Sequence, residues 1–225
     1  MKKFYLVVSM AFAITFLYAQ RVVIKPNAVH GIMNTKINSS YQTFMTADTI
    51  DDHFIGATPT IYTAQGGGFV VGNNAYNDIG KMQLFDPVHG VTTGGTITNI
   101  LFWFGAEQGN PSSTFTAKIW SDIAGKPGTV LGSVAVTFAD IDTSAAGTFP
   151  TTNAAYNTIA TFTTPVNIPT NRKFWAGMSI DTLPGDTIGL VTSTSGDFAD
   201  AATNTFEQWN DGTYHTFNDG TNNSW

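Results

Sequence analysis

The chain of 225 residues contains no cysteine and very few of the residues that favour helices, with seven Leu and two Glu. Without cysteine there is no disulfide and no thiol nucleophile, so stability must come from a buried core. The scarcity of strong helix formers excludes a mainly helical protein. The abundant residues are 34 Thr, 22 Gly and many aromatics, a composition that fits pleated, half-buried strands.

Positive charge is also in short supply. Ten Lys and Arg stand against 16 acidic residues, which gives a formal net charge of −6. This balance disfavours nucleic acid as a partner, because binding to the phosphate backbone depends on Lys and Arg. All but two of the acidic residues are Asp, which hydrogen-bonds its own backbone in turns, so the negative charge belongs mainly to connections between strands.

A single apolar run occurs, at the very start, in "MKKFYLVVSMAFAITFLYAQ". Lys2 and Lys3 precede the apolar residues 4–18, and Leu17-Tyr18-Ala19 precedes a cleavage position before Gln20, so residues 1–19 are predicted to be a signal peptide. The run is shorter than the roughly 20 residues of a membrane-spanning helix. We therefore expect a protein that is secreted or displayed on the cell surface, with no membrane span after cleavage and a net charge of about −8.

Residues 20–60 show no clear period and are interpreted as an N-terminal extension or an edge element. From residue 61 to 225, short segments alternate with clusters of Gly, Pro, Asn and Asp, a pattern typical of an all-β fold. We predict an antiparallel β-sandwich, jelly-roll-like in topology. The expected strands are 68–76, 81–86, 95–105, 113–121, 129–139, 156–164, 172–181, 186–193 and 204–210.

Two strands can be divided into faces, because successive side chains of a strand point to opposite sides. Trp120 and Trp175 fall on the more polar face of their strands, where a large indole is out of place unless something covers it. Trp103 lies in "NILFWFG", which is apolar on both faces and predicts a central strand covered on both sides. The residues predicted to face the core are Phe115, Ala117, Ile119, Phe174, Ala176, Met178 and Ile180.

Reaction motifs are missing from the sequence. There is no Gly-x-Ser-x-Gly elbow and no His-Glu-x-x-His pair, and "GGG" at 66–68 lacks the Lys-Ser/Thr of a phosphate loop. Glu107 and Glu207 do not nominate a carboxylate pair for glycoside hydrolysis. We therefore expect a protein that is not an enzyme.

Five segments carry a resemblance when they are taken in order: "GGTITNILFWFGA", "AKIWSDIAGKPGTVLGS", "FTTPVNIPTNRKFWAGMSI", "PGDTIGLVTSTSGD" and "FEQWNDGTYHTFND". From about residue 60 onward the chain resembles a β-sandwich module of secreted Bacteroidetes proteins, which are often multidomain and use the type IX secretion system. The resemblance implies export and a cell-surface location, and it carries over no catalytic residues. The C-terminal sorting domain that family members typically carry is not present in this sequence, which puts surface anchoring in doubt.

Two functions fit these observations. The first is glycan binding, in which Trp120, Trp175 and Trp209 stack on sugar rings of a polysaccharide. The second is a structural or adhesive spacer that contacts other surface modules and binds no small ligand. The two differ in whether Trp120 and Trp175 are exposed as a pair or covered by another part of the protein.

No organic cofactor is expected, but Asp pairs raise the prospect of a calcium site. Asp140 and Asp142 stand two apart in "ADIDTS", so both carboxylates would project to one side of an extended segment. Asp181 and Asp186 flank the turn "TLPG". Calcium prefers several carboxylate and carbonyl oxygens. The alternative is that these Asp side chains hydrogen-bond their own turns.

The last segment, "FEQWNDGTYHTFNDGTNNSW", predicts a strand, a turn at Asn210-Asp211-Gly212, and a return strand that begins at Tyr214. Ser224 and Trp225 look like the first residues of a further strand. We therefore expect a truncated product that lacks a closing strand, and such a truncation would leave a sheet edge unpaired.

Overall fold

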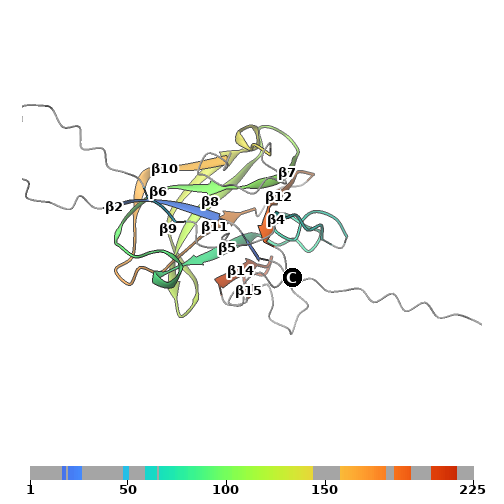
Figure 1. Ribbon diagram of the computed structural model, residues 1–225. Helices are drawn as coiled ribbons and strands as arrows, with labels where there is room; N and C mark the ends of the chain where they lie inside the picture. The colour runs from blue at the N-terminus through green and yellow to red at the C-terminus, as the bar shows by residue number, and fades with distance from the viewer. Residues whose placement is uncertain are drawn as a thin grey trace, which may run out of the picture.

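The computed structural model describes residues 17–18, 20–26, 48–50, 59–64, 66–143, 158–180, 185–193 and 204–216. In these residues the protein is all-β, and every strand pair is antiparallel (Figure 1). None of the helical turns in this part of the chain has the length and apolarity of a membrane-spanning helix. The predicted fold class, an antiparallel β-sandwich, is confirmed; the jelly-roll topology stays a prediction.

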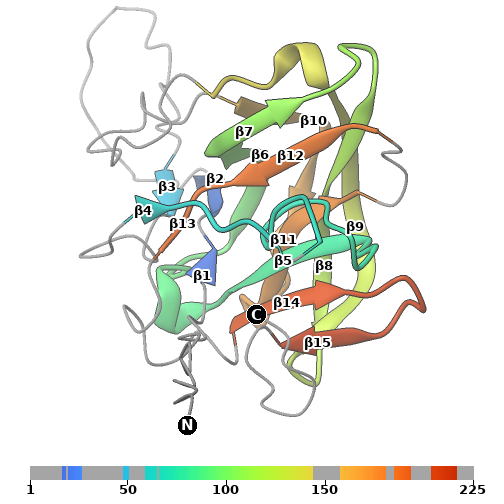
Figure 2. The same ribbon diagram turned by 90° about the vertical axis from the view of Figure 1, so that its right-hand side faces the viewer.

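The larger sheet has six strands in the order β15-β14-β5-β11-β8-β9 (Figure 2). β11 lies at its centre and pairs with β5 on one side and β8 on the other. The strands are β5 (Gly80–Phe85), β8 (Thr114–Ile123), β9 (Lys126–Thr137), β11 (Phe174–Ser179), β14 (Thr205–Gln208) and β15 (Tyr214–Thr216).

The facing layer is built from smaller sheets. Its largest has the order β10-β6-β2-β3, and β12 pairs with β7 beside it. A third sheet has the order β1-β13-β4. The strands are β1 (Leu17–Tyr18), β2 (Gln20–Pro26), β3 (Asp48–Ile50), β4 (Pro59–Thr60), β6 (Gly95–Phe102), β7 (Phe104–Gln108), β10 (Thr158–Asn167), β12 (Thr187–Leu190) and β13 (Thr192–Ser193).

The N-terminal segment contributes directly to this layer. Within residues 20–60, β2 lies inside the four-stranded sheet between β6 and β3, and β3 forms its edge. β1 falls within the predicted signal peptide and pairs with β13. Cleavage before Gln20 would remove β1 and leave β13 paired with β4.

The main core fills the space between the layers. It contains all seven side chains that the sequence assigns to the core faces of β8 and β11 and the following residue, so that prediction is confirmed. The rings of Phe102, Phe104 and Phe115 meet at centroid distances of 5.3–5.7 Å. Trp103 is buried as predicted, and its neighbours on both faces of β6 and β7 are buried as well.

Three of the predicted strands differ from the observed ones. Residues 68–76 are not a strand but a compact loop held by isolated bridges, and Gly66, Gly67 and Gly68 all have positive φ, which residues with a Cβ rarely adopt. The expected strand 95–105 breaks at Trp103 into β6 and β7, and 186–193 breaks at Val191 into β12 and β13. Apolar content alone does not show where a strand changes sheet.

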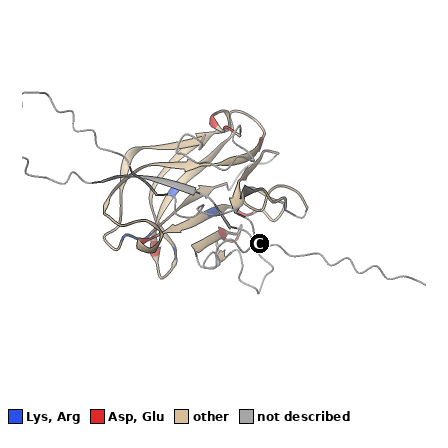
Figure 3. Cartoon of the chain, in the orientation of Figure 1, with Lys and Arg blue, Asp and Glu red and all other residues tan. Residues whose placement is uncertain are grey.

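Charged residues are few along the strands, and the acidic segments lie mainly near strand ends (Figure 3). This agrees with the expectation from the Asp-rich composition. Two charged side chains on strands, Lys81 of β5 and Glu207 of β14, are buried.

Candidate functional site

Trp120 and Trp175 face each other directly across β8 and β11, on the side of the six-stranded sheet opposite the main core. Trp120 is 4% exposed and Trp175 is 0% exposed. The two rings belong to a second apolar cluster, formed with Met82, Leu84 and Phe206 and flanked by Tyr214. Of the two alternatives that the sequence leaves open, an exposed pair and a covered pair, the covered pair is the one observed.

The packing explains this burial. The Trp175 ring meets the Phe206 ring edge-on, with centroids 5.0 Å apart. The indole nitrogen of Trp175 donates a hydrogen bond of 2.9 Å to Asp122 Oδ1, so the polar end of the ring has a partner. Large apolar side chains on four neighbouring strands cover one another, and the faces that would stack on a sugar are occupied.

Trp209, the third candidate for sugar stacking, lies at the end of β14 in the hairpin turn to β15. The predicted turn at Asn210–Gly212 is present, closed by a hydrogen bond from Gly212 N to Trp209 O. The half-buried indole stacks on the His215 ring at a centroid distance of 3.5 Å. Its nitrogen donates a 2.7 Å hydrogen bond to Glu207 Oε1. One face of this ring is thus held by the protein itself.

The hydrogen bond from Trp209 leads to a buried charged cluster, defined here as Asp78, Lys81 and Glu207. Lys81 Nζ lies 2.5 Å from Asp78 Oδ2 and 3.0 Å from Glu207 Oε2. The exposed fractions of these side chains are 0% for Lys81, 5% for Asp78 and 7% for Glu207. Asn74 donates a further hydrogen bond of 2.7 Å to Asp78.

Burial dominates the electrostatics of Glu207. It raises the pKa of the Glu207 carboxyl above its ordinary value, although the Lys81 charge acts in the opposite direction. The negative charge of Asp78 adds to the increase. On the neighbouring position of the same face of β5, Gln83 is buried and its Oε1 has no hydrogen-bond partner. The core-facing side of β5 and β14 therefore carries several polar side chains.

A second polar network holds the turn after β5. Asp86 caps the 3-10 turn η1 (Pro87–His89) by accepting hydrogen bonds from the backbone of Val88 and His89. It also contacts His89 Nδ1 at 2.8 Å, and His89 Nε2 lies 3.0 Å from the Asn204 amide. Burial favours the neutral acid, but these hydrogen bonds and the His89 charge outweigh it and lower the pKa of Asp86.

We expect Asp86→Asn to cost about 1 kcal/mol of stability at pH 7, because the charged cap and its contact to His89 are lost. The folded-state pKa of Asp86 lies below its ordinary value of 3.8, so its contribution is present above that pH and is lost as the pH falls through the folded pKa. Urea unfolding of both proteins from pH 7 to pH 3 measures this. A stability difference that stays constant across the range would contradict the assignment.

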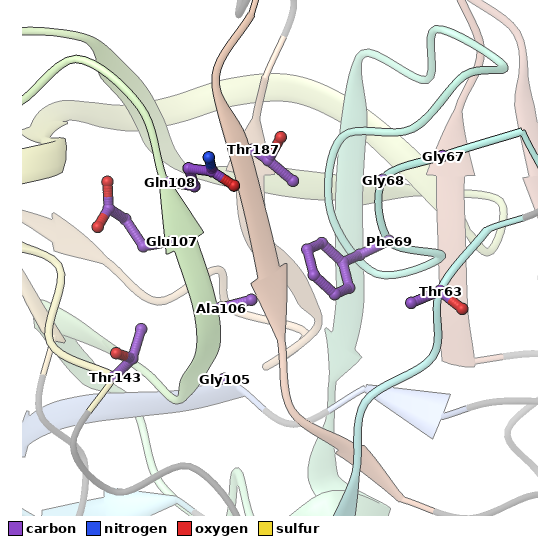
Figure 4. A pocket seen from close by; sticks show the side chains of 10 residues that line it. All are labelled: Thr63, Gly67, Gly68, Phe69, Gly105, Ala106, Glu107, Gln108, Thr143 and Thr187. Atoms are coloured by element: carbon purple, nitrogen blue, oxygen red, sulfur yellow. The ribbon is translucent and has the colours of Figure 1, made fainter.

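A shallow hollow of about 460 Å³ lies between β7, β12 and the loop that precedes β5 (Figure 4). Phe69 lies on one side of β12, and Glu107 and Gln108 of β7 lie on the other. The ring of Phe69 rests over Gly189, where a Cβ would come within 2.6 Å of it. The remaining lining residues are Thr63, Gly67, Gly68, Gly105, Ala106, Thr143 and Thr187.

Two of the four Asp side chains considered for calcium, those of Asp140 and Asp186, accept hydrogen bonds from within the protein. Asp140 lies in the 3-10 turn η2 (Phe138–Asp140) and not in an extended segment, and it accepts a 2.5 Å hydrogen bond from Thr137. Asp186 Oδ1 accepts from the backbone of Asn110 at 2.8 Å. The backbone of Asp142 donates to Thr158 at 3.0 Å. Asp181 lies outside the described residues. No group of three or more His, Asp or Glu able to hold a metal ion occurs in the described ranges.

Sequence reasoning missed the buried charged cluster. Lys81 lies in a predicted strand and shares its face with Phe85, a member of the main core. The sequence did contain one signal of this cluster: a lysine at a strand position whose side chain faces the core. Its partner Glu207 follows 126 positions later, and no sequence pattern links residues so far apart.

In comparisons with family models, curated proteins and solved structures, the chain matches none.

Proposed function

We propose that this chain is a non-catalytic β-sandwich module of a secreted or cell-surface protein, with a structural or adhesive role and no small ligand at its Trp residues. The observation that carries the proposal is the second apolar cluster. The six-stranded sheet packs on both faces, with Trp120 and Trp175 buried on the outer one. Because the rings of Trp120 and Trp175 are covered, neither is available to stack on a sugar, which favours the structural or adhesive role over glycan binding at these residues.

Localisation and binding can be tested together. We expect protease added to intact cells to remove the protein, or the protein to accumulate in the medium. The purified protein should show no saturable binding to a panel of soluble polysaccharides. A product that stays protected inside intact cells, or a saturable sugar complex abolished by Trp175→Phe, would overturn this proposal.

A second candidate function is glycan binding at the hollow beside β12. The observation that favours it is the combination of one half-buried aromatic ring, Phe69, with the carboxylate of Glu107, the amide of Gln108 and the hydroxyl groups of Thr143 and Thr187. A flat apolar surface beside a few polar groups that fix orientation is typical of small-ligand sites.

If a glycan binds in the hollow, Gln108→Ala should weaken its binding about tenfold, the loss that corresponds to one hydrogen bond of about 1.4 kcal/mol. Tyr76→Ala is the control, because Tyr76 is an exposed aromatic residue in the loop that contains Phe69 but does not line the hollow. Isothermal titration against the sugar retained best in the panel measures both. Equal affinity of the two variants would exclude this site.

A further inference from the structure

The buried charged cluster has an unusual composition for the interior of a sandwich. One ammonium group faces two carboxylates, and all three side chains are at least nine-tenths buried. Burying charged groups is costly, and an ion pair of this kind is often no more stable than an apolar replacement. A reaction that converts the charged groups into neutral ones would remove this cost.

We propose that Lys81 and Glu207 condense into an intramolecular amide bond, a covalent link between β5 and β14 that the protein forms by itself. The two residues are direct partners in the antiparallel pairing of these strands. Lys81 Nζ lies 3.0 Å from Glu207 Oε2, and the carboxyl carbon is one covalent bond beyond that oxygen. Reacting groups held this close behave as if they were present at very high concentration.

The reaction needs no oxidant, metal or further reactant. The Asp78 carboxylate takes a proton from the Lys81 ammonium, which frees the amine lone pair. The amine attacks Cδ of the protonated Glu207 carboxyl, and a C–N bond forms. The nitrogen then releases a second proton to the Glu207 hydroxyl oxygen, the C–O bond breaks, and one water leaves. The products are a neutral amide, water and protonated Asp78.

The surroundings supply the other requirements of acyl transfer. Trp209 Nε1 donates a 2.7 Å hydrogen bond to Glu207 Oε1, the oxygen that carries negative charge when Cδ becomes tetrahedral. Asp78 Oδ2 lies 2.5 Å from the nitrogen whose proton it must take. The raised pKa of Glu207 favours the protonated carboxyl that reacts. Burial of the cluster keeps bulk water away from the intermediate.

The geometry favours Glu207 over Asp78 as the carboxyl that reacts. Asp78 is three residues from Lys81, so a bond between them would link one short segment to itself. Glu207 is 126 positions away and carries the hydrogen bond from Trp209. A bond at Glu207 would fix the β14–β15 hairpin to the middle of the sheet, and it would give a chain without cysteine one covalent cross-link.

Intact-mass spectrometry of the purified protein tests the proposal. Wild type should be lighter than its sequence by about 18 Da, the mass of one water. Lys81→Arg keeps a positive charge but has no reactive amine, and it should show no such deficit. Because both proteins share the same N-terminus, any cyclisation of an N-terminal Gln20 affects them equally.

Three further measurements define the outcome. Chymotryptic fragments should contain residue 81 joined to residue 207, Asp78→Asn should lose the deficit, and the cross-linked protein should melt roughly 10 °C above Lys81→Arg. A wild type with its full sequence mass would overturn the proposal, and this measurement does not depend on any variant folding. A fragment that joins residue 81 to residue 78 would overturn the assignment to Glu207.

Discussion

Trp175→Ala is expected to lower the free energy of unfolding by about 3–5 kcal/mol, the range for truncating a large buried aromatic side chain. The indole is fully buried, it packs edge-on against Phe206, and its nitrogen bonds to Asp122. Truncation leaves a cavity in the second apolar cluster and an unpartnered Asp122 carboxylate. Urea unfolding followed by circular dichroism measures the loss.

Tyr76→Ala provides the comparison for this prediction. Tyr76 is also aromatic but is 47% exposed, so its removal should change stability by less than about 0.5 kcal/mol. Similar losses in the two variants would show that the outer face of the six-stranded sheet is not a packed cluster.

Lys81→Met is expected to be about 3–5 kcal/mol less stable than Lys81→Arg at pH 7, because it leaves the carboxylates of Asp78 and Glu207 buried without a cation. Neither variant can form the amide, so the two differ in charge and not in the cross-link. Methionine has nearly the length of lysine and fills most of the space, so the loss reports charge more than volume. Adding Glu207→Gln to Lys81→Met removes one of the two unpaired charges and should recover part of the lost stability. A double variant no more stable than Lys81→Met would contradict this explanation.

The pH dependence of Lys81→Met has a defined sign. In a variant that cannot form the amide, burial raises the pKa of the folded Glu207 carboxyl, so its contribution to stability is greatest below its ordinary pKa of 4.5 and is lost as the pH rises through the folded value. Without the Lys81 ammonium this pKa rises further. The difference between Lys81→Arg and Lys81→Met should therefore shrink as the pH falls from 7 toward 5, and unfolding series at both pH values measure it.

Alternation of side chains predicted the faces of β8 and β11 because only two directions exist along a strand. It placed Phe115 and Phe174 in the main core and Trp120 and Trp175 opposite them. Exposure could not be predicted in the same way, because it depends on which strands become neighbours. Phe206, which covers Trp175, lies 31 residues further along the chain on a strand two positions away in the sheet.

The loop at 66–77 and the buried charged cluster show the same limit. The sequence predicts a strand over 68–76, but the segment folds into a compact loop that begins with three successive glycines of positive φ. Lys81 and Glu207 become partners only when β14 pairs with β5, a contact between residues 126 positions apart. Local pattern describes each strand by itself, whereas these sites are created by the order of strands in the sheet.

Hydroxyl-radical footprinting read out residue by residue tests most directly the claim that the six-stranded sheet is packed on both faces. Exposed Tyr76 should be oxidised rapidly in the native protein, whereas Trp120 and Trp175 should be protected to the same degree as Trp103 of the main core. All four residues should become equally accessible in urea. Oxidation of Trp120 and Trp175 in the native protein at a rate close to that of Tyr76 would contradict the account and restore an exposed aromatic pair.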